Sequence, residues 1–191
     1  MLKSLLKSRK LEKRANISIL GPSQSGKTTL VKFLETGMPQ LEVPLSTLGI
    51  EIRQRGVEIA NWRFQLIDVG GQQVYQEVFW ELAVEQANSF IYLIDATVRP
   101  ENRPEIFEFQ KQQYIYAMDL IPEDAVILIL LNKQDLVDEN PINPKEFGKI
   151  YPLDKLKART VAFLPSSAKF GNGVEDAMLW FVSAMERSNV F

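Results

Sequence analysis

The stretch of sequence that decides the fold is Gly21-Pro22-Ser23-Gln24-Ser25-Gly26-Lys27-Thr28, which matches the pattern G-x-x-x-x-G-K-[ST]. It follows a short apolar run at residues 17–20 and precedes a helical pattern at residues 27–36. A glycine-rich loop between a strand and a helix turns its backbone N–H groups inward and binds phosphate groups. In such loops the lysine reaches the β- and γ-phosphates, and the final hydroxyl is a ligand of Mg²⁺. The loop alone does not distinguish ATP from GTP, and an ordinary glycine turn is the alternative.

Strand patterns and helical patterns alternate along the rest of the chain. Buried or half-buried strands are predicted at residues 50–53, 62–66, 90–94, 126–131 and 161–164. Helices are predicted at residues 104–119, 144–150 and 174–187. The second of these helices has Asn143 as its N-cap, Pro144 in its first position and Glu146 in its third. The alternation predicts one three-layer α/β domain with a mostly parallel sheet, whose ligands lie at the carboxyl ends of the strands.

The composition narrows the chemistry that this domain can perform. The chain has 191 residues, of which 46% are hydrophobic and 24% charged, as in a globular domain rather than a disordered chain. It contains no cysteine and no histidine. This excludes Ser-His-Asp and Cys-His nucleophiles, zinc sites built from these residues, and disulfides. Any chemistry must therefore use carboxylates, amides, hydroxyls, Lys or Arg, backbone dipoles or a hard metal ion.

The net charge of −2 conceals a basic segment at the start of the chain. Residues 1–14 carry six basic residues and one acidic residue, a sum of +5, whereas residues 15–191 sum to −7. If the basic segment is helical, four leucines form a narrow apolar stripe among the lysines: Leu2, Leu5, Leu6 and Leu11. No apolar run is long enough for a signal peptide or a membrane span. The sequence thus predicts a basic amphipathic arm, residues 1–14, and a folded domain, residues 15–191.

A second motif, Asn132-Lys133-Gln134-Asp135, directly follows the predicted strand at residues 126–131. A carboxylate at the end of N-K-x-D can accept two hydrogen bonds from the N1–H and N2–H₂ edge of guanine, whereas adenine offers no such pair. Leaving that carboxylate unpaired against the wrong base is costly, so selectivity of about 10⁴ is attainable. Ser-Ser-Ala-Lys at residues 166–169 follows the last predicted strand and adds a backbone N–H near guanine O6. The alternative is a polar turn that closes a strand.

Two further motifs lie between these, Thr47-Leu48-Gly49 and Asp68-Val69-Gly70-Gly71-Gln72. With the strings DVGGQ and NKQDL, residues 15–187 resemble the Arf/Arl/Sar branch of the small GTPases in the Ras superfamily. The resemblance implies a P-loop GTPase fold, a six-stranded, mostly parallel sheet flanked by about five helices, with an N-terminal amphipathic helix. It also implies binding of GTP or GDP with Mg²⁺, and a change of shape when GTP is hydrolysed.

The resemblance assigns nucleotide contacts to individual residues. Lys27 would hold the β- and γ-phosphates, and its neighbours in the loop would surround them: Ser23, Gln24, Ser25, Gly26, Thr28 and Thr29. Guanine would be framed by residues of the two later motifs: Asn132, Lys133, Asp135, Ser167, Ala168 and Lys169.

The resemblance also assigns the metal ligands and the catalytic residue. Thr28 would bind Mg²⁺ in both nucleotide states, Thr47 only when GTP is bound, and Asp68 through a water. The Gly71 amide would contact the γ-phosphate. Gln72 would be catalytic and orient the attacking water, which suits a chain without histidine because this reaction relies on positioning and charge stabilisation.

Several positions depart from the Arf pattern. Ser23 stands where that branch usually has Asp, and Leu45 and Ser46 separate Pro44 from Thr47. Ser46 is therefore the alternative to Thr47 as the switch hydroxyl, and the pattern Thr-x-Gly favours Thr47. Pro44 occupies the position of the arginine that Gα proteins supply in cis, so we expect slow hydrolysis that depends on an activating protein.

The predicted function is that of a monomeric, cytoplasmic GDP/GTP switch that regulates membrane association or partners of the kind used in trafficking. Its partners would be exchange proteins, GTPase-activating proteins, and effectors at the switch regions. One alternative is a GTP-binding scaffold subunit with negligible hydrolysis; another is an ATP-using P-loop enzyme, which NKQD disfavours. The apolar residues after Gln72 form either a partner surface or a buried helical stripe: Val74, Tyr75, Val78, Phe79 and Trp80.

The basic arm, residues 1–14, predicts peripheral attachment to an anionic membrane in the GTP state. Leu2 stands where N-myristoylation needs glycine, and the absence of cysteine excludes prenylation and palmitoylation. The alternative is a helix that is solvated or docked on the folded domain, with no role at a lipid surface. A basic arm is also found in proteins that bind nucleic acids, but nothing else in the sequence supports that function.

Overall fold

The computed structural model describes residues 13–41, 51–59, 62–70, 76–156 and 159–188, with the backbone alone at residues 51–55, 67–70 and 76–78. Its strands are β1 (Lys13–Leu20), β2 (Glu51–Ile59), β3 (Trp62–Gly70), β4 (Ser89–Asp95), β5 (Val126–Asn132) and β6 (Thr160–Pro165). Its α-helices are α2 (Lys27–Thr36), α3 (Gln76–Glu85), α4 (Pro104–Leu120), α5 (Pro144–Ile150) and α6 (Val174–Ser188). Two 3₁₀ turns complete the described elements, η2 (Val137–Glu139) and η3 (Asp154–Leu156).

The six strands form one sheet in the order β2-β3-β1-β4-β5-β6. Strand β2 is antiparallel to β3, and the other neighbours are parallel. This confirms the predicted α/β fold with a six-stranded, mostly parallel sheet and five α-helices among the described residues. The carboxyl ends of β1, β4, β5 and β6 therefore meet at one edge of the sheet, where the motif loops begin.

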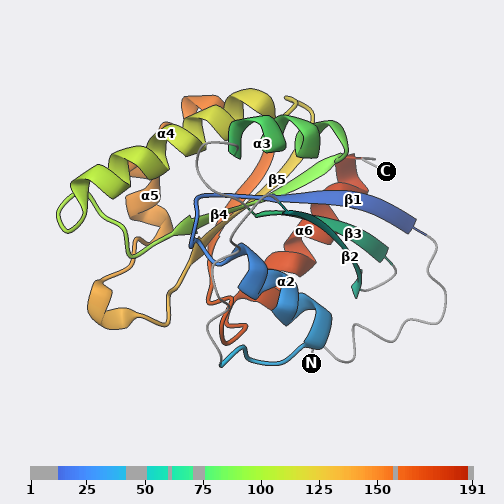
Figure 1. Cartoon of the computed structure of the whole chain (residues 1–191), viewed down its shortest axis with the longest axis horizontal. Helices are drawn as coiled ribbons and strands as arrows, with labels where there is room; N and C mark the ends of the chain where they lie inside the picture. Colours follow the sequence, from blue (N-terminus) through green and yellow to red (C-terminus); the bar gives the residue numbers. More distant parts are fainter. Residues whose placement is uncertain (1–12, 42–50, 60–61, 71–75, 157–158, 189–191) are drawn as a thin grey trace.

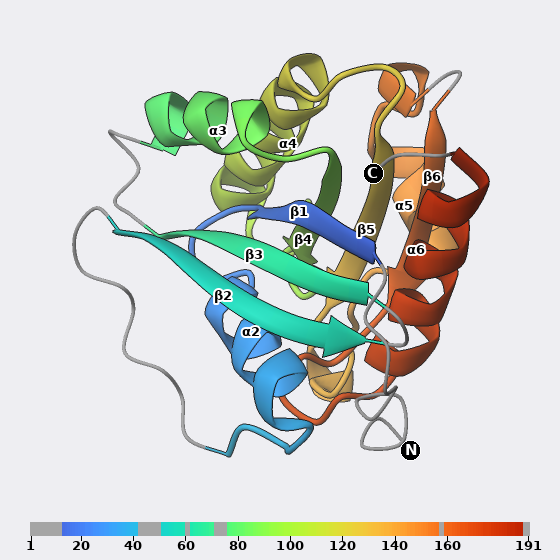
Figure 2. The same cartoon turned by 90° about the vertical axis from the view of Figure 1, so that its right-hand side faces the viewer.

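Helices cover both faces of the sheet, as Figures 1 and 2 show. Helices α2 and α6 pack on one face, against residues such as Ile17 and Leu128. Helices α3, α4 and α5 pack on the other face, against residues such as Phe90 and Ile127. Every residue of β4 and β5 is buried, which explains their continuous apolar runs.

Strand β1 begins earlier than its apolar run at residues 17–20 predicts. Lys13 and Arg14 are in register with Trp62 and Arg63 of β3, so two basic residues counted with the arm lie in the sheet. The Lys13 ammonium lies 5.3 Å from the centre of the buried Trp62 ring and pairs with Glu186 of α6. A lysine stem can cover an indole while its charge stays in water, a tertiary contact that the strand pattern does not reveal.

The helix after the Asp68–Gln72 motif, α3, presents both kinds of surface that the sequence left open. The ring of Trp80 is buried between Tyr92 of β4 and Tyr116 of α4. Leu82 on the same helix is 41% exposed, and Phe79 is half-buried. Val74 and Tyr75 lie outside the described residues, and the side chain of Val78 is not described. Trp80 therefore belongs to the buried stripe, and Leu82 to the surface.

The start of α5 confirms the predicted cap. The Asn143 side chain accepts from the backbone N–H groups of Lys145 and Glu146, while the Glu146 carboxylate accepts from the Asn143 N–H. Arg99, in the loop after β4, donates to Glu146 and to the carbonyl of Asn140. The hydrogen bond from Arg99, followed by that from the Asn143 N–H, lowers the pKa of Glu146.

Replacing Glu146 by glutamine is expected to lower the free energy of unfolding by about 1 kcal/mol near neutral pH, after allowance for solvent screening. Because the folded-state pKa of Glu146 is lowered, this stabilisation is present above the ordinary carboxyl pKa and is lost as pH falls through the lowered value. Urea unfolding at a series of pH values measures it. Glu105→Gln, in the first turn of α4, is the control, and an equal, pH-independent effect of both variants would contradict the role of Arg99.

Candidate functional site

The loop between β1 and α2 depends on two glycines. Gly21 and Gly26 have φ values of 141° and 103°, which side-chain-bearing residues rarely adopt. A Cβ atom would lie 2.3 Å from the Leu93 carbonyl oxygen at Gly21, and 2.2 Å from the Asn132 amide nitrogen at Gly26. Both positions therefore exclude any side chain, and the loop is held tightly against β4 and against the motif after β5.

Lys27 is buried at the start of α2, and its ammonium lies inside the loop. Nζ donates to the carbonyl oxygens of Gly21 and Pro22, both at 2.8 Å. The loop thus curves around a positive charge at a helix N-terminus, where unsatisfied N–H groups favour an anion. Among the described residues, the buried Ser25 hydroxyl has no hydrogen-bond partner. A buried polar atom of this kind, beside a cation and a helix N-terminus, fits a loop that closes on phosphate groups.

Asn132 joins the phosphate loop to the two later motifs. Its side chain is only 2% exposed, and its Nδ2 donates to the Ser25 carbonyl at 2.7 Å. Its Oδ1 accepts from the Ala168 N–H at 2.8 Å, and the Ser166 hydroxyl lies 3.5 Å from the same oxygen. One amide side chain therefore holds three loops together, from the carboxyl ends of β1, β5 and β6.

Asp135 is held in place by the motif after β6. The Ser167 hydroxyl donates to Asp135 Oδ1 at 2.6 Å and accepts from the Phe170 N–H at 3.3 Å. Asp135 itself is half-buried, so its carboxylate combines a fixed position with access from solvent. A carboxylate held in this way can accept hydrogen bonds from a planar donor pair.

The second residue of the motif after β5, Lys133, pairs with a residue that belongs to no motif. Lys133 adopts a φ of 70°, and its Nζ donates to Asp95 Oδ2 at 2.6 Å. The buried Asp95 also accepts two hydrogen bonds from Thr97, through its N–H and its hydroxyl. Asp95 is the register neighbour of Asn132. Asp95 directly follows the apolar run at residues 90–94, and this position was the signal that could have identified it. The carboxyl ends of the parallel strands β4 and β5 lie side by side, so an acidic residue there lies next to the motif after β5.

The remaining predicted nucleotide residues are divided between described and undescribed parts of the chain. Ser23 and Gln24 are exposed at the tip of the loop, Thr28 and Thr29 are half-buried in the first turn of α2, and Lys169 lies over the Phe170 ring. Three predicted residues lie outside the described residues: Thr47, Gly71 and Gln72.

The predicted metal ligands that are described come from two neighbouring elements. Asp68 is in register with Ile19, just before the phosphate loop, although its side chain is not described. Thr28 lies in the first turn of α2. Within the described ranges, no three Asp, Glu, His or Cys residues gather as a metal cage. Mg²⁺ needs no such cage, because it commonly takes one or two protein ligands together with substrate phosphates and water.

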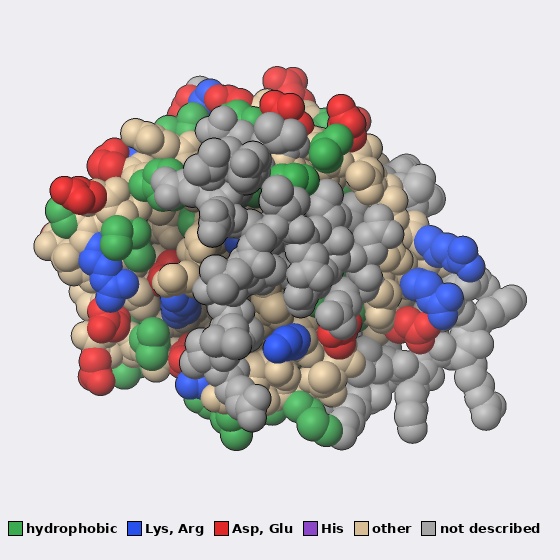
Figure 3. Space-filling model, viewed as in Figure 1, with side chains coloured by type: hydrophobic (Ala, Val, Ile, Leu, Met, Phe, Trp, Pro, Cys, Tyr) green, Lys and Arg blue, Asp and Glu red, His purple; other side chains and the backbone are tan. Residues whose placement is uncertain are grey.

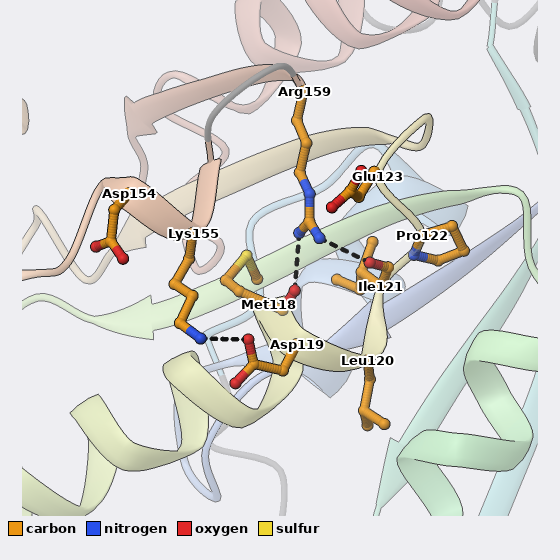
Figure 4. A pocket seen from close by; sticks show the side chains of 9 residues that line it. All are labelled: Met118, Asp119, Leu120, Ile121, Pro122, Glu123, Asp154, Lys155 and Arg159. Carbon is orange, nitrogen blue, oxygen red and sulfur yellow. Dashed lines mark hydrogen bonds and ion pairs between the residues drawn. The ribbon is translucent and has the colours of Figure 1, made fainter.

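A separate cavity of about 510 Å³ lies at the amino ends of β5 and β6, away from the motif loops (Figure 4). Arg159 donates there to the carbonyl oxygens of Met118 and Ile121, and Lys155 pairs with Asp119. Both cations thus bind groups at the carboxyl end of α4. This cavity contains none of the predicted site residues.

Comparison with known proteins identifies the family of the chain. The sequence matches the profile of the ADP-ribosylation factor family over residues 1–185. An ADP-ribosylation factor-like protein 1 of Caenorhabditis elegans is 29% identical over 174 residues, which cover 90% of this chain and 89% of that protein. The protein of the same name in Drosophila melanogaster is 28% identical over 188 residues, which cover 96% of this chain and 94% of that protein. The chain therefore belongs to the ADP-ribosylation factor family of GTP-binding small GTPases.

Proposed function

We propose that this chain is a molecular switch that binds GTP or GDP with Mg²⁺ and hydrolyses GTP slowly. The observation that carries the proposal is the position of Asn132, whose side chain ties the phosphate loop to the loop of Ala168. Through it, a ligand with a phosphate chain at one end and a base at the other would meet a single connected site. Family membership supports GTP binding in general.

At the phosphate end, Lys27 and the N–H groups at the start of α2 would hold the β- and γ-phosphates. Thr28, Thr47 and Asp68 are the residues that would hold Mg²⁺, with Ser46 as the alternative to Thr47. When bound, Mg²⁺ would neutralise negative charge on the phosphates. The Gly71 amide would contact the γ-phosphate, and Gln72 would orient the attacking water.

At the base end, the Asp135 carboxylate would accept the N1–H and N2–H₂ donors of guanine, while Ser167 keeps it oriented. Lys133, fixed by Asp95, would support the ring system with its stem. The Ala168 N–H already donates to Asn132. Its predicted contact with guanine O6 therefore requires a hydrogen bond shared between two acceptors, a common arrangement at helix ends and turns.

The nucleotide that copurifies with the chain tests this proposal. Denaturation followed by chromatography is expected to release GDP or GTP; ATP or ADP alone would favour the P-loop enzyme that uses ATP. Single-turnover hydrolysis then separates a switch from the GTP-binding scaffold. A slow rate near the order of 10⁻⁴ s⁻¹, abolished by Gln72→Leu, supports the switch. No hydrolysis even with an activating protein would support the scaffold.

The basic arm is proposed to attach the GTP-bound chain to anionic membrane surfaces. None of the described helices is long and apolar enough to cross a bilayer. Figure 3 shows a small group of basic side chains at the right edge of this face, near the start of β1 in Figure 1. The arm joins the folded domain at that point, so its lysines would lie near these basic side chains.

Flotation with anionic liposomes is expected to recover the GTP-analogue form in several-fold excess over the GDP form. In this proposal the arm reaches the lipid surface only in the GTP form, and each Lys or Arg near that surface contributes about 1 kcal/mol. Leu6→Glu should abolish flotation by interrupting the apolar stripe. Ile106→Glu, which changes an exposed apolar residue on α4, is the matched control. Absence of both nucleotide forms from the lipid fraction would refute the membrane role.

A further inference from the structure

The loop between β6 and α6, which carries Ser167, Ala168 and Lys169, is attached to a segment that the motifs do not include. The backbone N–H of Gln40 donates to the carbonyl oxygen of Lys169 at 2.7 Å. Gln40 belongs to the chain that leaves α2 and leads, seven residues later, to Thr47. The structure therefore joins the loop expected at guanine to the chain that follows α2, which lies beside it in Figure 2.

Thr36, the last residue of α2, organises this segment. Its hydroxyl donates to the Lys32 carbonyl at 2.8 Å and accepts from the Met38 N–H and from the Gln40 side-chain amide. The same Gln40 amide also donates to the Met38 carbonyl at 2.8 Å. Gly37 ends the helix with a φ of 64° and turns the chain back. The Gln40 N–H thus reaches Lys169 from a turn held by side-chain hydrogen bonds.

A second contact, between Phe33 of α2 and Gly171, restrains the same loop. Gly171 has a φ of 82°, and a Cβ atom there would lie 2.0 Å from the nearest atom of the Phe33 ring. The aromatic ring is therefore seated directly on the glycine backbone, and it is almost fully buried. The ring contact and the Gln40 hydrogen bond lie on either side of Phe170, so they restrain both ends of residues 169–171.

We infer that Phe33, Thr36 and Gln40 form a latch on Lys169 and Gly171 that slows the release of guanine nucleotide. The latch presupposes the guanine-nucleotide binding proposed above. It acts because the Ala168 amide and Ser167 can frame a base only while residues 169–171 keep the loop in place. Phe33, Thr36 and Gln40 would thus act as positioning residues, through Lys169 and Gly171.

The release of fluorescent GDP, chased by excess unlabelled GDP, tests the latch. Thr36→Val keeps the shape of the side chain and removes the hydroxyl, and it should accelerate release about three- to tenfold, the range for one or two lost hydrogen bonds. Thr36→Ser retains the hydroxyl and should restore the wild-type rate. Phe33→Leu should accelerate release about tenfold. The association rate of GDP should change little, because the phosphate loop is intact in each variant.

A control variant separates the latch from general loosening of the fold. Phe90→Leu removes the same ring from the amino end of β4, in the core on the other face of the sheet. It should lower stability to a similar extent and leave the release rate unchanged. Equal acceleration by Phe33→Leu and Phe90→Leu, or wild-type release from Thr36→Val, would overturn the latch. Binding of ATP and not GDP by the wild-type chain would refute the proposed function itself. That result differs from the two above, in which the wild-type chain binds GDP and only the latch is refuted.

Discussion

Replacing Asp135 by asparagine is expected to lower the affinity for GTP by about 10³-fold or more and to raise the affinity for xanthosine triphosphate. The carboxylate would accept two donors from guanine, whereas the asparagine amide would present a donor toward the N2–H₂ group. Xanthine carries a carbonyl at that position and would accept from the new amide. The Ser167 hydroxyl can still donate to the remaining oxygen, so the loop should keep its conformation.

Competition binding of GTP and xanthosine triphosphate against a fluorescent nucleotide measures this exchange of specificity. Asp138→Asn is the matched control, because Asp138 is exposed in η2, outside the motif. It should leave both affinities at their wild-type values. An unchanged affinity of Asp135→Asn for GTP would overturn the assignment of this carboxylate to guanine and leave NKQD as a polar turn.

Replacing Asn132 by alanine is expected to reduce nucleotide affinity about 100-fold and the free energy of unfolding by about 3 kcal/mol. The change leaves the Ser25 carbonyl and the Ala168 N–H without their partner in a buried region. It therefore weakens the phosphate loop and the base loop at the same time, although they are far apart in the sequence. Both effects should exceed those of removing any single exposed hydrogen bond.

Isothermal titration with GDP and urea unfolding measure the two effects separately. Gln134→Ala is the control from the same motif, because the Gln134 side chain donates to the carbonyls of Leu131 and Ile142, and the substitution retains the backbone N–H that donates to Ser166. It should lower stability with little change in nucleotide affinity. A loss of affinity no greater than that of Gln134→Ala would show that Asn132 does not couple the loops.

The fold could be predicted from the sequence because its signals are local. The apolar runs of β4 and β5 report burial on both faces, and the cap of α5 lies within four consecutive residues. Strand periodicity and capping depend on neighbours a few residues away. The start of β1 was missed for the same reason, because Lys13 enters the sheet through Trp62 and Glu186, which are distant in the chain.

The candidate site could be predicted as a set of residue types but not as a set of contacts. The motifs name Lys27, Asn132 and Asp135 by their spacing, and the fold brings their loops to one edge of the sheet. No pattern indicates that Asn132 bonds to Ser25, since 107 residues separate them. Asp95 was overlooked because it belongs to no motif, and only its register with Asn132 places it beside Lys133.

The sequence by itself determined the family, the order of most strands and helices along the chain, and the chemistry available without cysteine or histidine. These follow from spacing and composition, which can be read without knowing which distant residues are neighbours in the fold. Only the tertiary structure decided how the loops are tied together: Asn132 to Ser25 and Ala168, Lys133 to Asp95, and Gln40 to Lys169. The physical reason is that hydrogen-bond partners are selected by distance and direction in the folded chain, and parallel strands bring together loops that the sequence keeps far apart.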